Sequence, residues 1–170
     1  SLGHQDKVAE VALITAAQKT VKEKISSTDL ERVTISLTAL GYDVQNFPLA
    51  DGSVVNIIEE IAKYERGKYG DGLGTLNGYI FALIAYDCGQ YTIPKGSKWK
   101  RQVVIDYILA HQLSDGGWNL NNEGLSDVDI TAMAIQALAP YYGQAKVKTA
   151  VDRALDKLSS MQVSSGPYSG

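Results

Sequence analysis

The chain has 170 residues, of which 45% are hydrophobic and 21% charged, and its formal net charge is -3. This length suffices for one domain with a sizeable buried core. The slight negative charge excludes a chain-wide basic surface for nucleic acid or an anionic membrane. The longest apolar run, residues 80–86, is too short to span a bilayer. We therefore expect one domain, residues 1–170, with no nucleic-acid partner and no membrane insertion.

The first predicted element is a helix over about residues 5–25, along which Val8, Val11, Ala12 and Val21 form an apolar stripe. Three similar segments follow, at residues 30–39, 76–85 and 128–137. Self-similarity at nearly regular spacing is the signature of a repeat architecture. The matching columns are Ile35/Phe81/Met133, Ser36/Ala82/Ala134, Leu37/Leu83/Ile135 and Ala39/Ala85/Ala137.

Each of these segments is followed by a second helical pattern, over about residues 54–64, 99–112 and 146–162. The third copy has the clearest helical spacing, with an apolar stripe of Val147, Ala150, Val151, Ala154, Leu155, Leu158 and Met161. The β-branched run "VVIDYI" (103–108) lies inside the second copy and is predicted to be helical, not a strand.

The two helices of each pair differ in polarity. The first is apolar on most faces and rich in Ala, Ser and Thr, which is typical of a helix buried on all sides; the second is amphipathic. We therefore predict helical hairpins at about 28–65, 76–112 and 126–162, with the apolar helices in an inner layer and the amphipathic helices in an outer layer.

A glutamine–aromatic motif follows the outer helices. Gln112-x-x-x-Gly116-x-Trp118 recurs as Gln162-x-x-x-Gly166-x-Tyr168. A glycine at 116 or 117 permits a positive φ in a tight turn after a helix. The tryptophan ring would then cover the helix end, and the glutamine would bond free backbone groups. We expect this motif to be structural.

This motif resembles the QW motif of squalene and hopene cyclases. Those enzymes share an α/α toroid with protein prenyltransferase β-subunits, cobalamin carriers and complement thioester domains. The stretches "LERVTISLTALGYD" (30–43), "LNGYIFALIAYDCGQY" (76–91) and 108–142 resemble most closely a prenyltransferase-like or squalene-cyclase-like module of large exported surface proteins of Gram-positive bacteria. The resemblance covers about residues 28–168.

The resemblance implies an all-α fold: a segment of an α/α toroid with about seven helices and an incomplete ring. The chain begins with an outer helix that lacks an inner partner and ends just after the second glutamine motif. We therefore expect a fragment of a longer protein. The resemblance also implies a location outside the cell or on the surface of a Gram-positive bacterium.

The acidic pair before residue 130 only partly matches the cyclase motif. Cyclases of this type use Asp-x-Asp-Asp to protonate their substrate, whereas this chain reads Asp127-Val128-Asp129-Ile130. Ser126-x-x-Asp129 also fits a helix capping box, and Thr28-x-x-Glu31 repeats that pattern. We expect capping, with a ligand-facing role and acid catalysis as the alternatives.

The metal and thioester motifs of the superfamily are not matched. Asp87 and Cys88 are adjacent where the prenyltransferases have Asp-x-Cys, and no histidine follows His111. Cys88-Gly89-Gln90 lacks the glutamate of the thioester sequence and places the glutamine one residue too early. We expect no metal site, no cofactor and no catalytic residue.

The candidate ligand site is the mouth where the N-termini of the inner helices would converge in a toroid. Glu31, Asn77 and Asp129 occupy equivalent positions there, and Tyr79, Asp127 and Thr131 lie close to them in the sequence. The chain has 10 tyrosines and 2 phenylalanines, which suits a partly wet groove. The alternative is that the tyrosines pack between the helix layers.

Three functions remain open from the sequence. The first is a non-catalytic ligand-binding or structural module of an exported bacterial surface protein, which holds a small ligand, a glycan or a neighbouring domain, with self-association as a further possibility. The second is an isoprenoid-processing enzyme, a terpene cyclase or prenyltransferase. The third is a carbohydrate-active α/α toroid, which needs a pair of carboxylates across a groove. The unmatched catalytic motifs favour the first.

Overall fold

The computed structural model describes residues 7–67 and 70–166. In this part of the chain most ordered structure is helical, which confirms the all-α prediction. The helices are α1 (Lys7–Glu23), α2 (Ser27–Ala39), α3 (Ile57–Ala62), α4 (Leu76–Asp87), α5 (Arg101–Ala110), α6 (Val128–Leu138) and α7 (Ala145–Met161), with a 3-10 turn η1 (Ala139–Tyr141) after α6. None of the described helices is both long and apolar enough to cross a bilayer.

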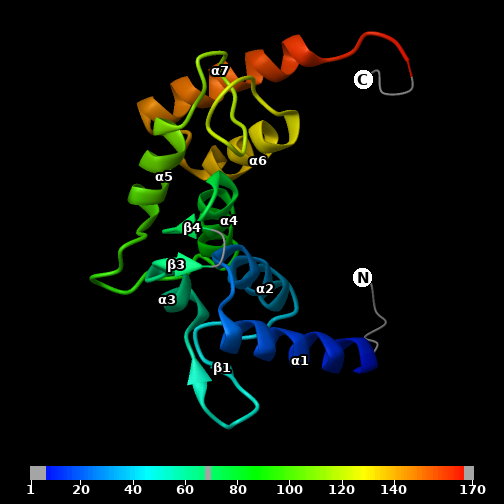
Figure 1. Cartoon of the computed structure of the whole chain (residues 1–170), viewed down its shortest axis with the longest axis vertical. Helices are drawn as coiled ribbons and strands as arrows, with labels where there is room; N and C mark the ends of the chain where they lie inside the picture. Colours follow the sequence, from blue (N-terminus) through cyan, green and yellow to red (C-terminus); the bar gives the residue numbers. More distant parts are fainter. Residues whose placement is uncertain (1–6, 68–69, 167–170) are drawn as a thin grey trace.

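The helices follow one another as neighbouring pairs. Figure 1 shows α2, α4 and α6 in succession through the molecule, with α3 and α5 beside them and α7 above α6. Helix α4 lies at the centre and packs against α2, α5 and α6, while α7 packs against both α6 and α5. The segments that the sequence analysis aligned therefore form a continuous row, and each is accompanied by the helix that follows it.

Only α4 has the burial expected of an inner helix. Eight of its twelve residues are buried, because α2, α5 and α6 pack around it, and the remaining four, Asn77, Phe81, Ile84 and Asp87, are half-buried. Helix α2 instead buries a single stripe and α6 exposes part of its surface, so the expectation that all three are covered on all sides is wrong for these two. The buried stripe of α2 comprises Ser27, Leu30, Glu31, Thr34 and Leu37.

Helix α1 buries little of its predicted apolar stripe. Ala17 and Val21 are buried, but Val8 and Val11 are 79% and 65% exposed. Only the C-terminal half of α1 therefore contributes to the core. Residues 5 and 6 of the predicted helix lie outside the described part of the chain.

Helix α2 is capped two residues earlier than predicted. Ser26, not Thr28, is the N-cap: its hydroxyl oxygen accepts a hydrogen bond from the Asp29 amide at 3.1 Å and donates to the Asp29 carboxylate at 2.7 Å. Glu31, the predicted partner of the cap, therefore lies in the second turn. Leu30 faces the core, and the adjacent residue Glu31 is buried beside it.

Helix α6 is capped by Asp127, one residue later than the predicted Ser126. The Asp127 carboxylate accepts a hydrogen bond from the Ile130 amide at 2.9 Å. The Ser126 hydroxyl and amide instead both donate to the Asp115 carboxylate, the amide at 3.1 Å. The acidic pair thus supplies a helix cap, but not through the predicted capping box.

Two short β-hairpins were not predicted. Strands β1 (Phe47–Pro48) and β2 (Val54–Val55) pair antiparallel, and so do β3 (Arg66–Gly67) and β4 (Gly70–Asp71). Because residues 54–55 belong to β2, α3 begins only at Ile57 and is shorter than the predicted helix. The predicted helical state of "VVIDYI" is confirmed, since the run lies in α5.

Candidate functional site

Three of the predicted ligand-binding residues are buried by packing. Glu31 and Thr131 are 0% exposed and Tyr79 is 4% exposed. The Tyr79 ring stacks on Tyr107 at a centroid distance of 3.5 Å and meets Trp99 edge-on. Burial and the neighbouring Tyr107 raise the pKa of Tyr79 to about 12. These three side chains have almost no surface with which to contact a ligand, and Tyr79 packs between helices α4 and α5.

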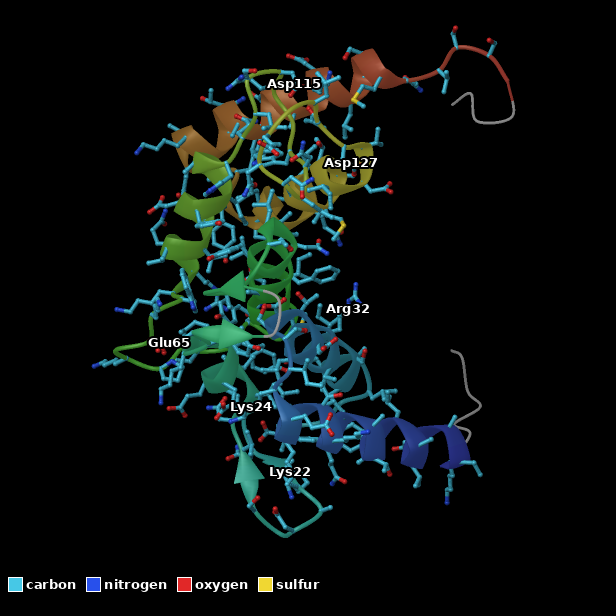
Figure 2. The ribbon with its side chains drawn as sticks, viewed as in Figure 1. Lys22, Lys24, Arg32, Glu65, Asp115 and Asp127 are labelled. Carbon is cyan, nitrogen blue, oxygen red and sulfur yellow. The ribbon has the colours of Figure 1, made fainter. Side chains whose placement is uncertain are left out.

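The other three predicted residues lie at or near the surface. Asp127 and Asp129 are exposed, and Asn77 is half-buried with an Oδ1 atom that has no hydrogen-bond partner. Figure 2 shows Asp127 at the α6 end of the molecule. Within the described residues, no side-chain hydrogen bond or ion pair links any of the six predicted residues to another.

Glu31 is a buried acid without a partner. Neither carboxyl oxygen has a hydrogen bond, and the nearby Ser27 hydroxyl donates to the Leu73 carbonyl at 2.8 Å instead. Burial raises the pKa of Glu31 well above the usual range, against smaller lowering effects of Ser27 and Arg32. Arg32 lies on the exposed side of the helix, away from α3, with its guanidinium over the Phe81 ring (Figure 2).

The glutamine–tryptophan motif lies where α5 meets α7. Gln112 Nε2 donates to the carbonyl oxygens of Gly116 at 2.8 Å and Ala150 at 2.7 Å. Gly116 has a φ of 100°, and a Cβ there would lie 2.9 Å from the Arg153 carbonyl oxygen. The motif therefore connects the turn after α5 to the outer helix of the next pair.

Trp118 and Gly117 complete this corner. The Trp118 side chain is 0% exposed and its Nε1 donates to the Ile108 carbonyl at 2.8 Å. The Trp118 amide donates to Thr131 Oγ1 at 2.9 Å, and that hydroxyl donates back to the Trp118 carbonyl at 3.1 Å. A Cβ on Gly117 would lie 2.5 Å from the Ser126 hydroxyl oxygen and 2.6 Å from Thr131 Oγ1, so the corner has no room for a side chain at 117.

The second copy of the motif is described only in part. Gln162 is the exposed C-cap residue of α7, and Gly166 has a φ of 98°, close to that of Gly116. Tyr168 lies outside the described residues. The glycines of the two copies therefore have the same positive-φ backbone conformation.

An open pocket of about 960 Å³ lies at the opposite end of α4 from the predicted mouth. Its wall is formed by the last residue of α4, the loop between α4 and α5, the first residues of α5 and the η1 turn. Its lining residues include Asp87, Tyr91, Thr92, Ile93, Pro94, Lys95, Lys100, Arg101, Pro140 and Tyr141.

Asp87, Arg101 and Tyr141 form a bonded cluster in the pocket wall. Arg101 Nε donates to the Asp87 carboxylate at 2.7 Å, and the Tyr141 hydroxyl donates to the same carboxylate at 2.7 Å. Arg101 Nη2 also donates to the Tyr86 carbonyl at 2.7 Å. Burial and the bonded carboxylate raise the pKa of Tyr141. The cluster joins α4, α5 and η1, and it neutralises the carboxylate.

Lys95 and Lys100 bring further positive charge to the pocket. Both side chains are exposed, and within the described residues no carboxylate oxygen lies within 4.0 Å of either ammonium group. Across the described residues, no three His, Cys, Asp or Glu side chains are grouped closely enough to hold a metal ion. The pocket therefore offers unpaired cations and aromatic rings to a ligand.

This pocket was not predicted from the sequence. The sequence feature that could have indicated it is the run "PKGSKWKR" (94–101), which concentrates four basic residues in a chain of net negative charge. The remaining parts, Asp87 and Tyr141, come from elements far apart in the sequence, so only packing brings them to the same wall.

Comparisons of the chain with protein-family models, with curated proteins and with solved structures give no match. The function of the pocket is therefore inferred from the chemistry of its own side chains.

Proposed function

We propose that the chain is a non-catalytic ligand-binding module of an exported bacterial surface protein, with a small ligand or a glycan bound in the pocket at the C-terminal end of α4. The observation that carries the proposal is the pocket of about 960 Å³, whose polar and aromatic side chains converge from α4, α5 and η1. This volume lies at the upper end of the range of small-molecule sites. The surface location and the toroid superfamily rest on the resemblance of the sequence motifs.

The positions of the acids support a binding role over acid catalysis. Asp127 caps α6 and faces solvent, and Asp129 is exposed. A general acid that protonates an alkene needs an environment that holds its proton, and an exposed carboxylate lacks one. Glu31 has such an environment, but it is sealed from solvent by the core. The row of paired helices is compatible with a segment of an α/α toroid.

The test is to fill the pocket. Thr92→Trp places a ring at an exposed lining position, and Thr149→Trp makes the same change on an exposed face of α7 outside the pocket. We expect ligands from a panel of sugars and sugar acids to shift the amide resonances of residues 90–102 in the wild type and in Thr149→Trp, but not in Thr92→Trp.

Two results would refute the proposal. Ligand shifts that persist unchanged in Thr92→Trp would place binding elsewhere on the protein. Turnover of geranyl diphosphate or squalene by the purified protein, measured by mass spectrometry of the products, would show that the module is an enzyme.

A further inference from the structure

We infer that the pocket at the end of α4 selects an anionic ligand: a carboxylate or phosphate group carried on a body of about the size of a sugar ring. This inference rests on the proposed function and specifies the class of ligand. It is carried by the charge of the lining side chains, by the segments that hold them and by the apolar surface between them.

The pocket carries an excess of positive charge in a chain with the opposite net charge. Three cationic side chains line it, Lys95, Lys100 and Arg101, against one carboxylate, Asp87. That carboxylate accepts hydrogen bonds from Arg101 Nε at 2.7 Å and from the Tyr141 hydroxyl at 2.7 Å. Its charge is therefore already compensated within the wall, and Lys95 and Lys100 remain to attract an anion.

The two lysines are held by different segments of the wall. Lys95 lies in a turn in which the Ser97 amide donates to the Pro94 carbonyl at 3.3 Å, and Gly96 has a φ of 84°. Lys100 is the N-cap residue of α5, whose first turn contains no acidic residue. The positive end of the α5 dipole thus adds to the field of the lysines. An anion between these segments would contact charge from two sides.

The rest of the wall suits a ring and not a bare ion. Ile93, Pro94 and Pro140 supply apolar surface, and the rings of Tyr91 and Tyr141 line the same pocket. Both tyrosine hydroxyls are already engaged, that of Tyr91 with Thr38 Oγ1 at 2.7 Å and that of Tyr141 with the Asp87 carboxylate, so the rings are held in place. Fixed aromatic rings and prolines bind the apolar faces of sugars.

The test compares four probes by calorimetric titration at low ionic strength: glucose 6-phosphate, glucuronate, inorganic phosphate and glucose. We expect the two sugar anions to bind more tightly than either phosphate or glucose alone. The variant Lys95→Ala/Lys100→Ala should weaken sugar-anion binding about tenfold, since it removes two exposed charges that would each attract the anion modestly. Added salt should weaken binding by the wild type in the same direction.

A second double variant, Lys19→Ala/Lys146→Ala, is the control. It removes the same charge from exposed positions on α1 and α7 outside the pocket, and should leave sugar-anion binding unchanged. Both pocket lysines are exposed and make no ion pair with a described residue, so the test variant should retain its fold, which circular dichroism checks.

The outcomes separate this inference from the proposed function. If glucose binds as tightly as the sugar anions and the lysine variant binds like the wild type, the anionic selectivity is refuted. The proposed function still stands in that case, provided that Thr92→Trp abolishes the binding. If inorganic phosphate binds as tightly as glucose 6-phosphate, the ring-sized body is refuted. If no ligand, from these probes or from the wider panel, gives binding that Thr92→Trp abolishes, both the inference and the proposed function fail.

Discussion

Replacing Trp118 with alanine tests the corner that connects one helix pair to the next. The ring is 0% exposed and its Nε1 donates to the Ile108 carbonyl at 2.8 Å. A buried aromatic side chain removes roughly 150–250 Å² from water, worth about 4–6 kcal/mol at 25 cal/mol per Å². This is an upper bound, because the unfolded chain already covers part of that area. Measured losses for such truncations are about 3–5 kcal/mol, so we expect a loss of about 4 kcal/mol.

A loss of this size is a large fraction of the stability of a domain, about 5–15 kcal/mol. For a chain of this length it corresponds to a decrease in Tm of about 10 °C. Trp118→Phe keeps an aromatic ring but removes one of the two donors to the Ile108 carbonyl, which still accepts from the His111 amide at 3.2 Å. The lost hydrogen bond and the smaller ring should together cost about 1–2 kcal/mol. Leu125→Ala is the control, because Leu125 is 79% exposed, and should change stability by less than about 0.5 kcal/mol.

Thermal and urea unfolding followed by circular dichroism measure all three variants. The Phe variant keeps the test informative if the Ala variant does not fold. The reasoning about the corner is refuted if Trp118→Ala unfolds within 2 °C of the wild type, because a fully buried ring cannot be removed without cost.

Gly117→Ala should destabilise the protein by about 1–3 kcal/mol in urea unfolding, since a Cβ at this position would lie 2.5 Å from the Ser126 hydroxyl oxygen. Gly143→Ala is the control and should be neutral, because a Cβ at 143 has no atom within 4 Å. Equal effects of the two variants would show that position 117 is not crowded. Asp127→Ala should lower the free energy of unfolding by about 1 kcal/mol, because the helix cap is lost, and Asp129→Ala by less than about 0.5 kcal/mol. A larger loss for Asp129→Ala than for Asp127→Ala would show that Asp127 is not the cap. Because burial raises the pKa of Glu31, the folded protein holds that proton more tightly than the unfolded chain does. The wild type should therefore lose stability relative to Glu31→Gln as the pH rises from about 4.5, and a difference that is independent of pH would show that Glu31 is solvated.

The helices were predictable because their signals are local. The stripe on α7 and the apolar composition of α4 mark helices at the right positions whatever surrounds them. Helix starts were less predictable, because Ser26 and Thr28, like Ser126 and Asp127, are all good caps. The choice between them is made by which following residues must be buried, and that depends on the neighbouring helix.

The pocket lies at the end of α4 opposite to the mouth that the sequence predicted. Aligned positions such as Glu31 and Asp129 were expected to share an environment, but one is 0% exposed and the other is exposed. Equivalent positions in a repeat differ in burial when their helices have different neighbours, as α2 and α6 do. The basic run 94–101 is evident in the sequence, but the sequence alone does not show that this run lines a pocket together with the end of α4 and η1.

The sequence by itself determined the helical class, the order of the hairpins and the residues of the glutamine–tryptophan corner, because periodicity and turn chemistry act over a few residues. The tertiary structure decided which acid is buried, which acid caps a helix and where a pocket opens. Those properties depend on contacts between residues far apart in the chain: Tyr141 reaches Asp87 only after η1 has been placed against the end of α4.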